Sequence, residues 1–168
     1  MLSEDCPMNR LLILPVLLLT LLLGNPAFSA DFQKGWDAAQ KGDFATALRE
    51  WKPLAEQGNA VAQYNLGLMY KDGKGVPQDY KTAVKWYRLA AEQGNSLAQG
   101  NLGVMYALGK GVIKDFVYAH MWGNLGASNG NENGGRLREI VTNRMTPSQL
   151  EKAKRLAREC VRKKYKGC

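Results

Sequence analysis

The feature that most constrains the fold of this chain is its self-similarity at a spacing of 36 residues. The segment QYNLGLMYKDGKGV at 63–76 returns as QGNLGVMYALGKGV at 99–112. The likeness extends beyond this segment, because Asp43, Asp79 and Asp115 stand at the same interval. A fixed period of this length is typical of stacked units that each pack on their neighbours. We therefore expect a repeat protein.

Each period predicts two helices with capping residues at their ends. Asn59 is placed to cap the first helix, and Gly73 follows its last turn, where glycine takes the left-handed conformation that ends a helix. Asp79 is placed to cap the second helix, and the same three residue types recur 36 positions later. The predicted helices span 32–41, 43–57, 60–71, 79–93, 96–107, 115–128, 134–144 and 147–165.

The shared residues carry a specific resemblance. The pattern A-Q-x-x-L-G-x-M-Y-x-x-G-x-G-V-x-x-D-[YF]-x-x-A-x-x-W begins at Ala62 and again at Ala98. It resembles the Sel-like repeat of exported bacterial proteins, an α-helical relative of the tetratricopeptide repeat. The resemblance implies an all-α fold, a right-handed α-solenoid of antiparallel helix pairs. The expected divisions are a signal peptide (1–30), a tetratricopeptide-like leading helix pair (31–59), two Sel-like repeats (60–95 and 96–131) and basic C-terminal capping helices (132–168).

The N-terminal segment has the pattern of a secretory signal peptide. An apolar run of 13 residues at 11–23 follows an arginine and precedes small residues, and it is shorter than the ~20 residues that a membrane-spanning helix needs. We expect cleavage after Ser29 or Ala30 and a periplasmic or secreted protein, with a retained anchor as the alternative. The acidic residues before Met8 are atypical of a signal peptide, so we expect Met8 to be the initiator.

The positive charge of the chain is concentrated near its C-terminus. Residues 136–168 hold 11 Lys or Arg against 3 Asp or Glu, whereas residues 31–135 hold 11 against 10. Outside the cytoplasm, anionic envelope surfaces or an acidic protein are more natural partners than nucleic acid. The alternative is a solvated helix face that keeps the protein soluble. The candidate basic surface comprises Arg155, Arg158, Arg162 and Lys163.

The two cysteines of the exported chain predict a disulfide. Cys160 and Cys168 form an even pair that would close a short loop, with two free thiols in a frayed tail as the alternative. Together with His120 they cannot fill a tetrahedral zinc shell, so we expect no metal site.

No motif in the sequence supports catalysis. A phosphate-binding loop needs a Ser or Thr after its lysine and a strand before it, and the recurrence of GKG argues for a turn between helices. His120 has no evident catalytic partners. Some exported members of the Sel-like family are associated with β-lactam binding or hydrolysis, but this chain has no S-x-x-K to support that activity. We expect neither a cofactor nor an enzyme.

Binding is expected on the concave face of the solenoid. If tetratricopeptide geometry applies, the first helix of each pair lines that face and forms an apolar groove for a partner segment. The alternatives are that the closing helices cover the groove or that several of these residues belong to the core. The positions where the two copies differ, Tyr64 against Gly100 and Leu68 against Val104, are where we expect the partner. The candidate residues are Phe32, Trp36, Gln40, Val61, Tyr64, Leu68, Lys71, Leu97, Gly100 and Val104.

These observations favour a non-enzymatic, monomeric scaffold of the cell envelope that binds a protein or peptide partner. The basic C-terminal helix adds an anionic envelope surface as a further candidate partner. The alternative function is an envelope protein that binds or hydrolyses cell-wall material, such as peptidoglycan or β-lactams.

Overall fold

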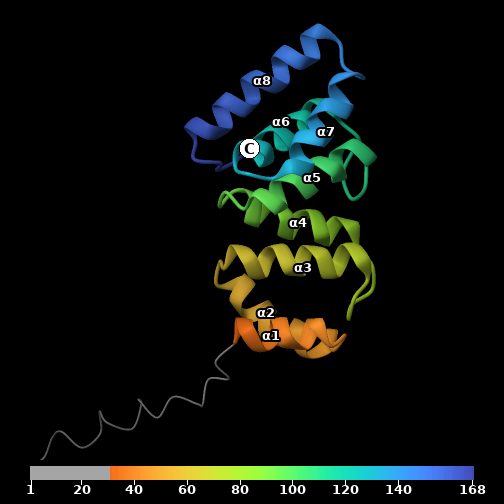
Figure 1. The fold of residues 1–168 in the computed structure, drawn as a ribbon, viewed down its shortest axis with the longest axis vertical. Helices are drawn as coiled ribbons and strands as arrows, with labels where there is room; N and C mark the ends of the chain where they lie inside the picture. Colours follow the sequence, from red (N-terminus) through yellow and green to blue (C-terminus); the bar gives the residue numbers. More distant parts are fainter. Residues whose placement is uncertain (1–30) are drawn as a thin grey trace, which may run out of the picture.

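The computed structural model describes residues 31–168, so the expected signal peptide and the expected initiator lie outside the described residues. Within that range the chain is all-α, with eight helices in antiparallel pairs stacked along one axis (Figure 1), as the resemblance implies. The helices are α1 (Phe32–Gln40), α2 (Phe44–Glu56), α3 (Ala60–Asp72), α4 (Tyr80–Ala91), α5 (Ser96–Leu108), α6 (Phe116–Ser128), α7 (Glu132–Thr142) and α8 (Pro147–Arg162).

The predicted capping residues form the helix ends. Asn59 Oδ1 accepts hydrogen bonds from the backbone N–H groups of Val61 (3.0 Å) and Ala62 (2.9 Å) at the start of α3. Gly73 ends α3 with φ at 68°, and Gly109 ends α5 with φ at 69°, both in the left-handed region that favours glycine. The GKG segments therefore turn one helix onto the next.

The last two helices differ from the predicted boundaries. α7 begins two residues early, because Asn131 caps it by accepting from the N–H groups of Asn133 (3.0 Å) and Gly134 (3.3 Å). α8 ends three residues early, because Lys164 and Tyr165 both have positive φ values (51° and 66°), which a continuing helix excludes.

The core lies between the stacked layers and consists of aromatic side chains against small residues. Tyr87 and Trp122 are completely buried. A Cβ atom added to Gly67 would lie 2.5 Å from two ring carbons of Tyr87, so α3 and α4 approach closely only because Gly67 has no side chain. Consecutive helices from α1 to α7 pack on one another along the stack, and α8 packs on α6.

Two buried glutamines connect the layers. Gln63 Nε2 donates to the carbonyl of Ala55 at the end of α2 (3.0 Å), and its Oε1 accepts from Gln93 Nε2 beyond α4 (2.8 Å). Gln99 makes the same two bonds one period later, at 3.1 and 2.9 Å. Each glutamine thus adds a side-chain donor to a helix-end carbonyl that also accepts from a backbone N–H of the following turn, Gly58 for Ala55 and Gly94 for Ala91 (both 3.0 Å).

A buried carboxylate fastens α1 to α2. Glu50 is buried, and its carboxylate accepts from Lys34 Nζ (3.0 Å), Arg49 Nη2 (3.4 Å) and the backbone N–H of Asp31 (3.3 Å). The hydrogen bond from Lys34 is the main cause that holds the pKa of Glu50 below its usual value, since it favours the ionised form.

The C-terminal tail folds back on the stack. The sulfur atoms of Cys160 and Cys168 lie 1.97 Å apart, at disulfide distance. Within the loop that they close, the Tyr165 ring lies near Gly94 and its hydroxyl donates to Asn129 Oδ1 (3.3 Å). This loop therefore attaches the end of α8 to the turns that follow α4 and α6.

Candidate functional site

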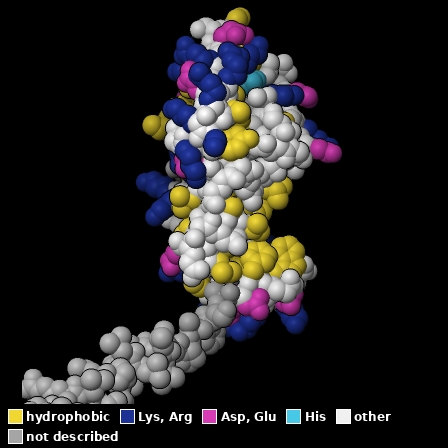
Figure 2. All heavy atoms as spheres, turned by 90° about the vertical axis from the view of Figure 1, so that its left-hand side faces the viewer, with side chains coloured by type: hydrophobic (Ala, Val, Ile, Leu, Met, Phe, Trp, Pro, Cys, Tyr) yellow, Lys and Arg dark blue, Asp and Glu magenta, His cyan; other side chains and the backbone are white. Residues whose placement is uncertain are grey.

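The first helices of the pairs present apolar side chains to solvent. Trp36 of α1 is 44% exposed, Val61 of α3 is 48% exposed and Leu97 of α5 is 50% exposed, and Val104 is also exposed. Figure 2 shows hydrophobic side chains gathered over the N-terminal part of the stack, whereas Lys and Arg gather at the α8 end. We call the exposed apolar residues of α1, α3 and α5 the apolar strip.

Part of the apolar strip is hollowed into a pocket of about 270 Å³ between α1 and α3, which we call the α1–α3 pocket. It forms because the short α1 and the longer α3 both pack on α2, which provides the floor between them. Its lining residues are Trp36, Ala39, Gln40, Phe44, Trp51, Asn65, Leu68, Met69, Asp72 and Lys74.

The structure brings three of the predicted partner-binding residues together in this pocket, Trp36, Gln40 and Leu68. Phe32 does not line it, because its ring packs on Trp51, with the ring centroids 5.9 Å apart. Lys71 lies outside the lining as well and pairs with Asp72 (3.2 Å).

The α1–α3 pocket also contains a buried polar group without a partner. Asn65 is only 5% exposed, and its Nδ2 atom makes no hydrogen bond with the described residues. A buried donor that stays unpaired costs about 1–3 kcal/mol, and an acceptor brought by a ligand would recover that cost. Asn65 lies one residue after the predicted Tyr64, and its sequence signal was its recurrence at Asn101.

Two of the positions where the repeats differ, Tyr64 and Gly100, offer less surface than expected. Gly100 is buried, and the Asn131 side chain occupies the space where a Cβ atom would stand, so Gly100 offers no surface to a partner. Tyr64 is half-buried and packs on Tyr87, with the ring centroids 6.0 Å apart. Leu97 remains exposed at the start of α5.

The closing helices leave the α1–α3 pocket open. α7 packs on α5 and α6, and Leu137 of α7 fits beside Gly103 of α5. α8 packs on α6, at the far end of the stack from α1 (Figure 1). α7 thus approaches α5 beside Gly103, while Leu97 and Val104 of α5 remain exposed.

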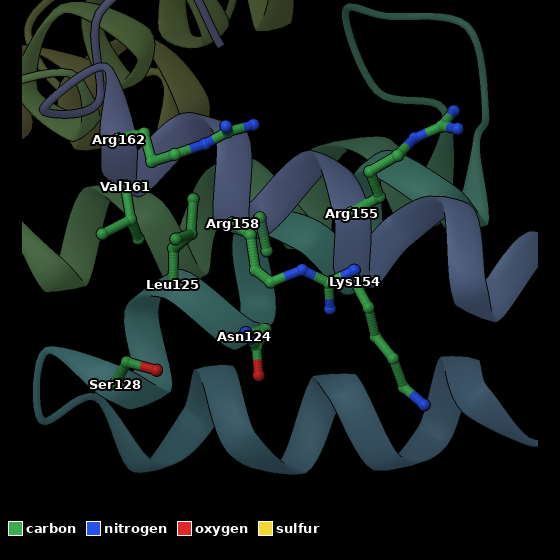
Figure 3. A pocket seen from close by; sticks show the side chains of 9 residues that line it. Asn124, Leu125, Ser128, Lys154, Arg155, Arg158, Val161 and Arg162 are labelled. Atoms are coloured by element: carbon green, nitrogen blue, oxygen red, sulfur yellow. The ribbon is translucent and has the colours of Figure 1, made fainter.

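A second hollow lies at the C-terminal end, between α6 and α8 (Figure 3), and we call it the α6–α8 groove. Its volume is about 690 Å³. Arg155, Arg158 and Arg162 of the predicted basic surface line it, whereas Lys163 lies beside Cys168 in a separate hollow. The complete lining is Asn124, Leu125, Ser128, Lys154, Arg155, Ala157, Arg158, Val161 and Arg162.

His120 lies in the interior of α6 and is buried. Burial lowers its pKa, and the positive charges of Arg138 and Lys154 lower it further, because all three effects disfavour the imidazolium form. Its Nδ1 atom has no hydrogen-bond partner among the described residues. Residues 31–168 also contain no group of three or more His, Cys, Asp or Glu side chains that could hold a metal ion.

No helix between residues 31 and 168 is long and apolar enough to span a membrane.

Comparison with known proteins supports the repeat assignment. The family model described as the Sel1 repeat matches residues 60–95 and 96–131. No curated protein matches the chain.

Two solved structures are similar to the chain. One is a protective antigen present in uropathogenic Escherichia coli strains that displays an SLR fold, with 34% identity and a TM-score of 0.74 over 78% of this chain. The other is a Sel1 repeat protein from Oxalobacter formigenes, with 35% identity and a TM-score of 0.56 over 60% of this chain. The chain spans 29% of the length of the first protein and 43% of the length of the second.

Proposed function

Because the chain is a Sel1-repeat protein, with two repeats at 60–131 and the fold of solved Sel1-repeat structures, we propose that it is a non-enzymatic scaffold whose α1–α3 pocket holds a segment of a partner protein. Repeats of this kind present extended surfaces on which partners bind. The observation that carries the proposal is the α1–α3 pocket itself, in which an exposed tryptophan, a leucine and an unpaired buried amide meet.

The three side chains suggest what the partner segment presents. Trp36 and Leu68 provide apolar surface, and tryptophan is frequent among the residues that dominate binding energy. Asn65 Nδ2 needs an acceptor, which the backbone carbonyl of a bound peptide supplies. An apolar side chain next to an accessible carbonyl is therefore the expected ligand. Asp72 and Lys74, which also line the pocket, carry opposite charges, so the pocket favours neither an acidic nor a basic partner segment.

The proposal is tested by co-purification from an envelope extract with the chain from residue 31 to 168. The double variant Trp36→Ala, Leu68→Ala should lose the partner by about tenfold, because it removes the apolar contact area that association depends on. Ile113→Ala is the matched control, since Ile113 is 90% exposed in the loop between α5 and α6. If the double variant retained every co-purifying protein while remaining folded, the pocket proposal would be rejected.

A single variant separates binding from folding. Asn65→Leu keeps the size of the side chain but removes the unpaired donor, so the free protein should become more stable by about 1 kcal/mol. Partner binding should weaken, because the acceptor of the partner loses its donor. Opposite changes in stability and binding are the expected result, and unchanged binding would remove Asn65 from the site.

We also propose that the protein works in the cell envelope or outside the cell, as a monomer. The support is the apolar run at 11–23 with its small-residue exit. Fractionation of cells that make the full chain, with mass measurement of the mature N-terminus, tests the location. A protein that begins at Ala30 or Asp31 in the periplasm or medium is expected, and an uncleaved cytoplasmic chain would contradict it.

A further inference from the structure

The α6–α8 groove carries an excess of positive charge. Lys154, Arg155, Arg158 and Arg162 line it, and none of its lining residues is a carboxylate. Lys154 pairs with the exposed Glu151 (2.9 Å) and Arg155 reaches Glu159 (3.9 Å). Across residues 31–168, Arg158 and Arg162 have no carboxylate within 4.0 Å. Two guanidinium groups are thus available to a ligand.

The spacing of these cations matches a helical ligand or an extended segment lying along α8. Residues 154, 158 and 162 recur every four positions, so they follow one face of the helix. In Figure 3 the side chains of Lys154 and Arg158 extend from α8 on the side where Asn124 lies. The guanidinium groups of Arg155 and Arg162 lie farther from Asn124. The cations are therefore distributed along the groove and around it.

The groove is not purely polar. Leu125 and Ala157 are buried within it, and Val161 is 53% exposed beside them. Asn124 Oδ1 already accepts from Arg138 Nη1 (3.0 Å), which leaves the amide nitrogen of Asn124 as a donor. A ligand that covers this surface fully needs carboxylates for the arginines and an apolar side chain for Val161.

We propose that the α6–α8 groove is a second docking site, which binds an acidic amphipathic peptide segment of a partner protein. Charge complementarity selects an acidic ligand, and carboxylates are the groups that arginine pairs with in two parallel hydrogen bonds. The volume of about 690 Å³ lies within the ~300–1,000 Å³ of typical ligand sites. A hollow between two helices admits a narrow segment, whereas a flat anionic bilayer would contact the outermost cations alone.

The site is tested by fluorescence anisotropy with the 31–168 chain and a labelled synthetic peptide that has Glu and Leu at helical spacing. A scrambled peptide of the same composition, polyglutamate and vesicles containing phosphatidylglycerol serve as competitors. The variant Arg158→Glu, Arg162→Glu should raise the Kd of the peptide by about tenfold or more, because it replaces two attractions by repulsions. The matched control Lys52→Glu, Lys85→Glu makes the same charge change at exposed lysines of α2 and α4.

The apolar part of the site has its own variant. Val161→Ser should weaken binding of the amphipathic peptide while leaving polyglutamate binding unchanged. Raising the salt concentration from about 0.01 M to about 0.15 M, where the Debye length falls from ~30 Å to ~8 Å, should weaken both ligands.

Three results would overturn the proposal: equal binding of the scrambled peptide, stronger binding of vesicles or polyglutamate than of the amphipathic peptide, or an equal loss in the lysine control. Each would mean an unselective basic surface. The site is separate from the α1–α3 pocket, so the Arg158→Glu, Arg162→Glu variant should retain any partner captured through Trp36. The two proposals can therefore fail independently.

Discussion

Replacing Gln99 by methionine should destabilise the fold, because Gln99 is completely buried and its hydrogen bonds join the end of α4 to the turn after α6. Methionine has nearly the same length and flexibility but no N–H group. The Gln99→Met variant therefore removes one of the two donors to the carbonyl of Ala91, Gln99 Nε2 at 3.1 Å, and leaves the Gly94 N–H at 3.0 Å, while little cavity is created. Asn129, which donates to Gln99 Oε1 at 2.9 Å, is exposed and can turn to water.

The expected loss follows from the removed side-chain hydrogen bond. A hydrogen bond contributes a net ~0.5–1.5 kcal/mol, so the free energy of unfolding should fall by ~1 kcal/mol. With an m-value of about 2 kcal/mol/M in urea, the midpoint should fall by ~0.5 M.

The assay is equilibrium urea unfolding followed by circular dichroism, with wild type and variant fitted for both midpoint and m-value. Gln57→Met is the matched control, because Gln57 is exposed at the end of α2. Its midpoint should move by less than about 0.3 M, since exposed substitutions usually change stability by under ~0.5 kcal/mol. Equal midpoints for Gln99→Met and Gln57→Met would refute the structural role of the glutamine.

Three further perturbations have expected outcomes. Reduction of the Cys160–Cys168 bond, which spans 8 residues, should lower the free energy of unfolding by ~2.5 kcal/mol, because the unfolded chain regains the entropy of the open loop. A reductant should not change the stability of Cys168→Ser. An equal loss in that variant would contradict the disulfide. Glu50 has a lowered pKa, so the stability that it contributes is present above pH 4.5 and is lost as the pH falls through the folded-state pKa. The free energy of unfolding of Glu50→Gln, measured over the same pH range, should not show this loss. Burial lowers the pKa of His120 in the folded protein. The free energy of unfolding should therefore fall as the pH decreases from 6.5 toward the folded-state pKa, because the unfolded chain gains the proton first. The variant His120→Asn should lose this pH dependence, and an unchanged slope would contradict the effect.

The sequence predicts the fold well, because the helix ends depend on local chemistry. Asn59, Asp79 and Gly73 act within one turn of their own positions, and each needs only its neighbours in the chain to cap or end a helix. The predicted start of α7 is two residues too late, although Asn131 stands two 36-residue intervals after Asn59 and caps its helix in the same way. Extending the period by one more unit would have found it.

The candidate sites are less predictable, because they depend on contacts between distant segments. Gly100 occupies the position of Tyr64 in the next repeat, yet its surface is taken by Asn131, which comes 31 residues later. The α1–α3 pocket depends on how α1 and α3 share α2, and the α6–α8 groove depends on where α8 lies across α6. Neither placement follows from the repeat pattern, which ends at residue 131.

Photo-crosslinking at Trp36 tests whether the α1–α3 pocket holds a partner segment. The photoreactive residue p-benzoylphenylalanine replaces Trp36, which is exposed and aromatic, in the full chain made by the cells that naturally produce it. A second chain carries it at Ile113, which is exposed but lies outside the pocket. We expect a discrete adduct from position 36 that disappears with Leu68→Ala, and none from position 113. The same adducts from both positions, or none from position 36, would contradict it.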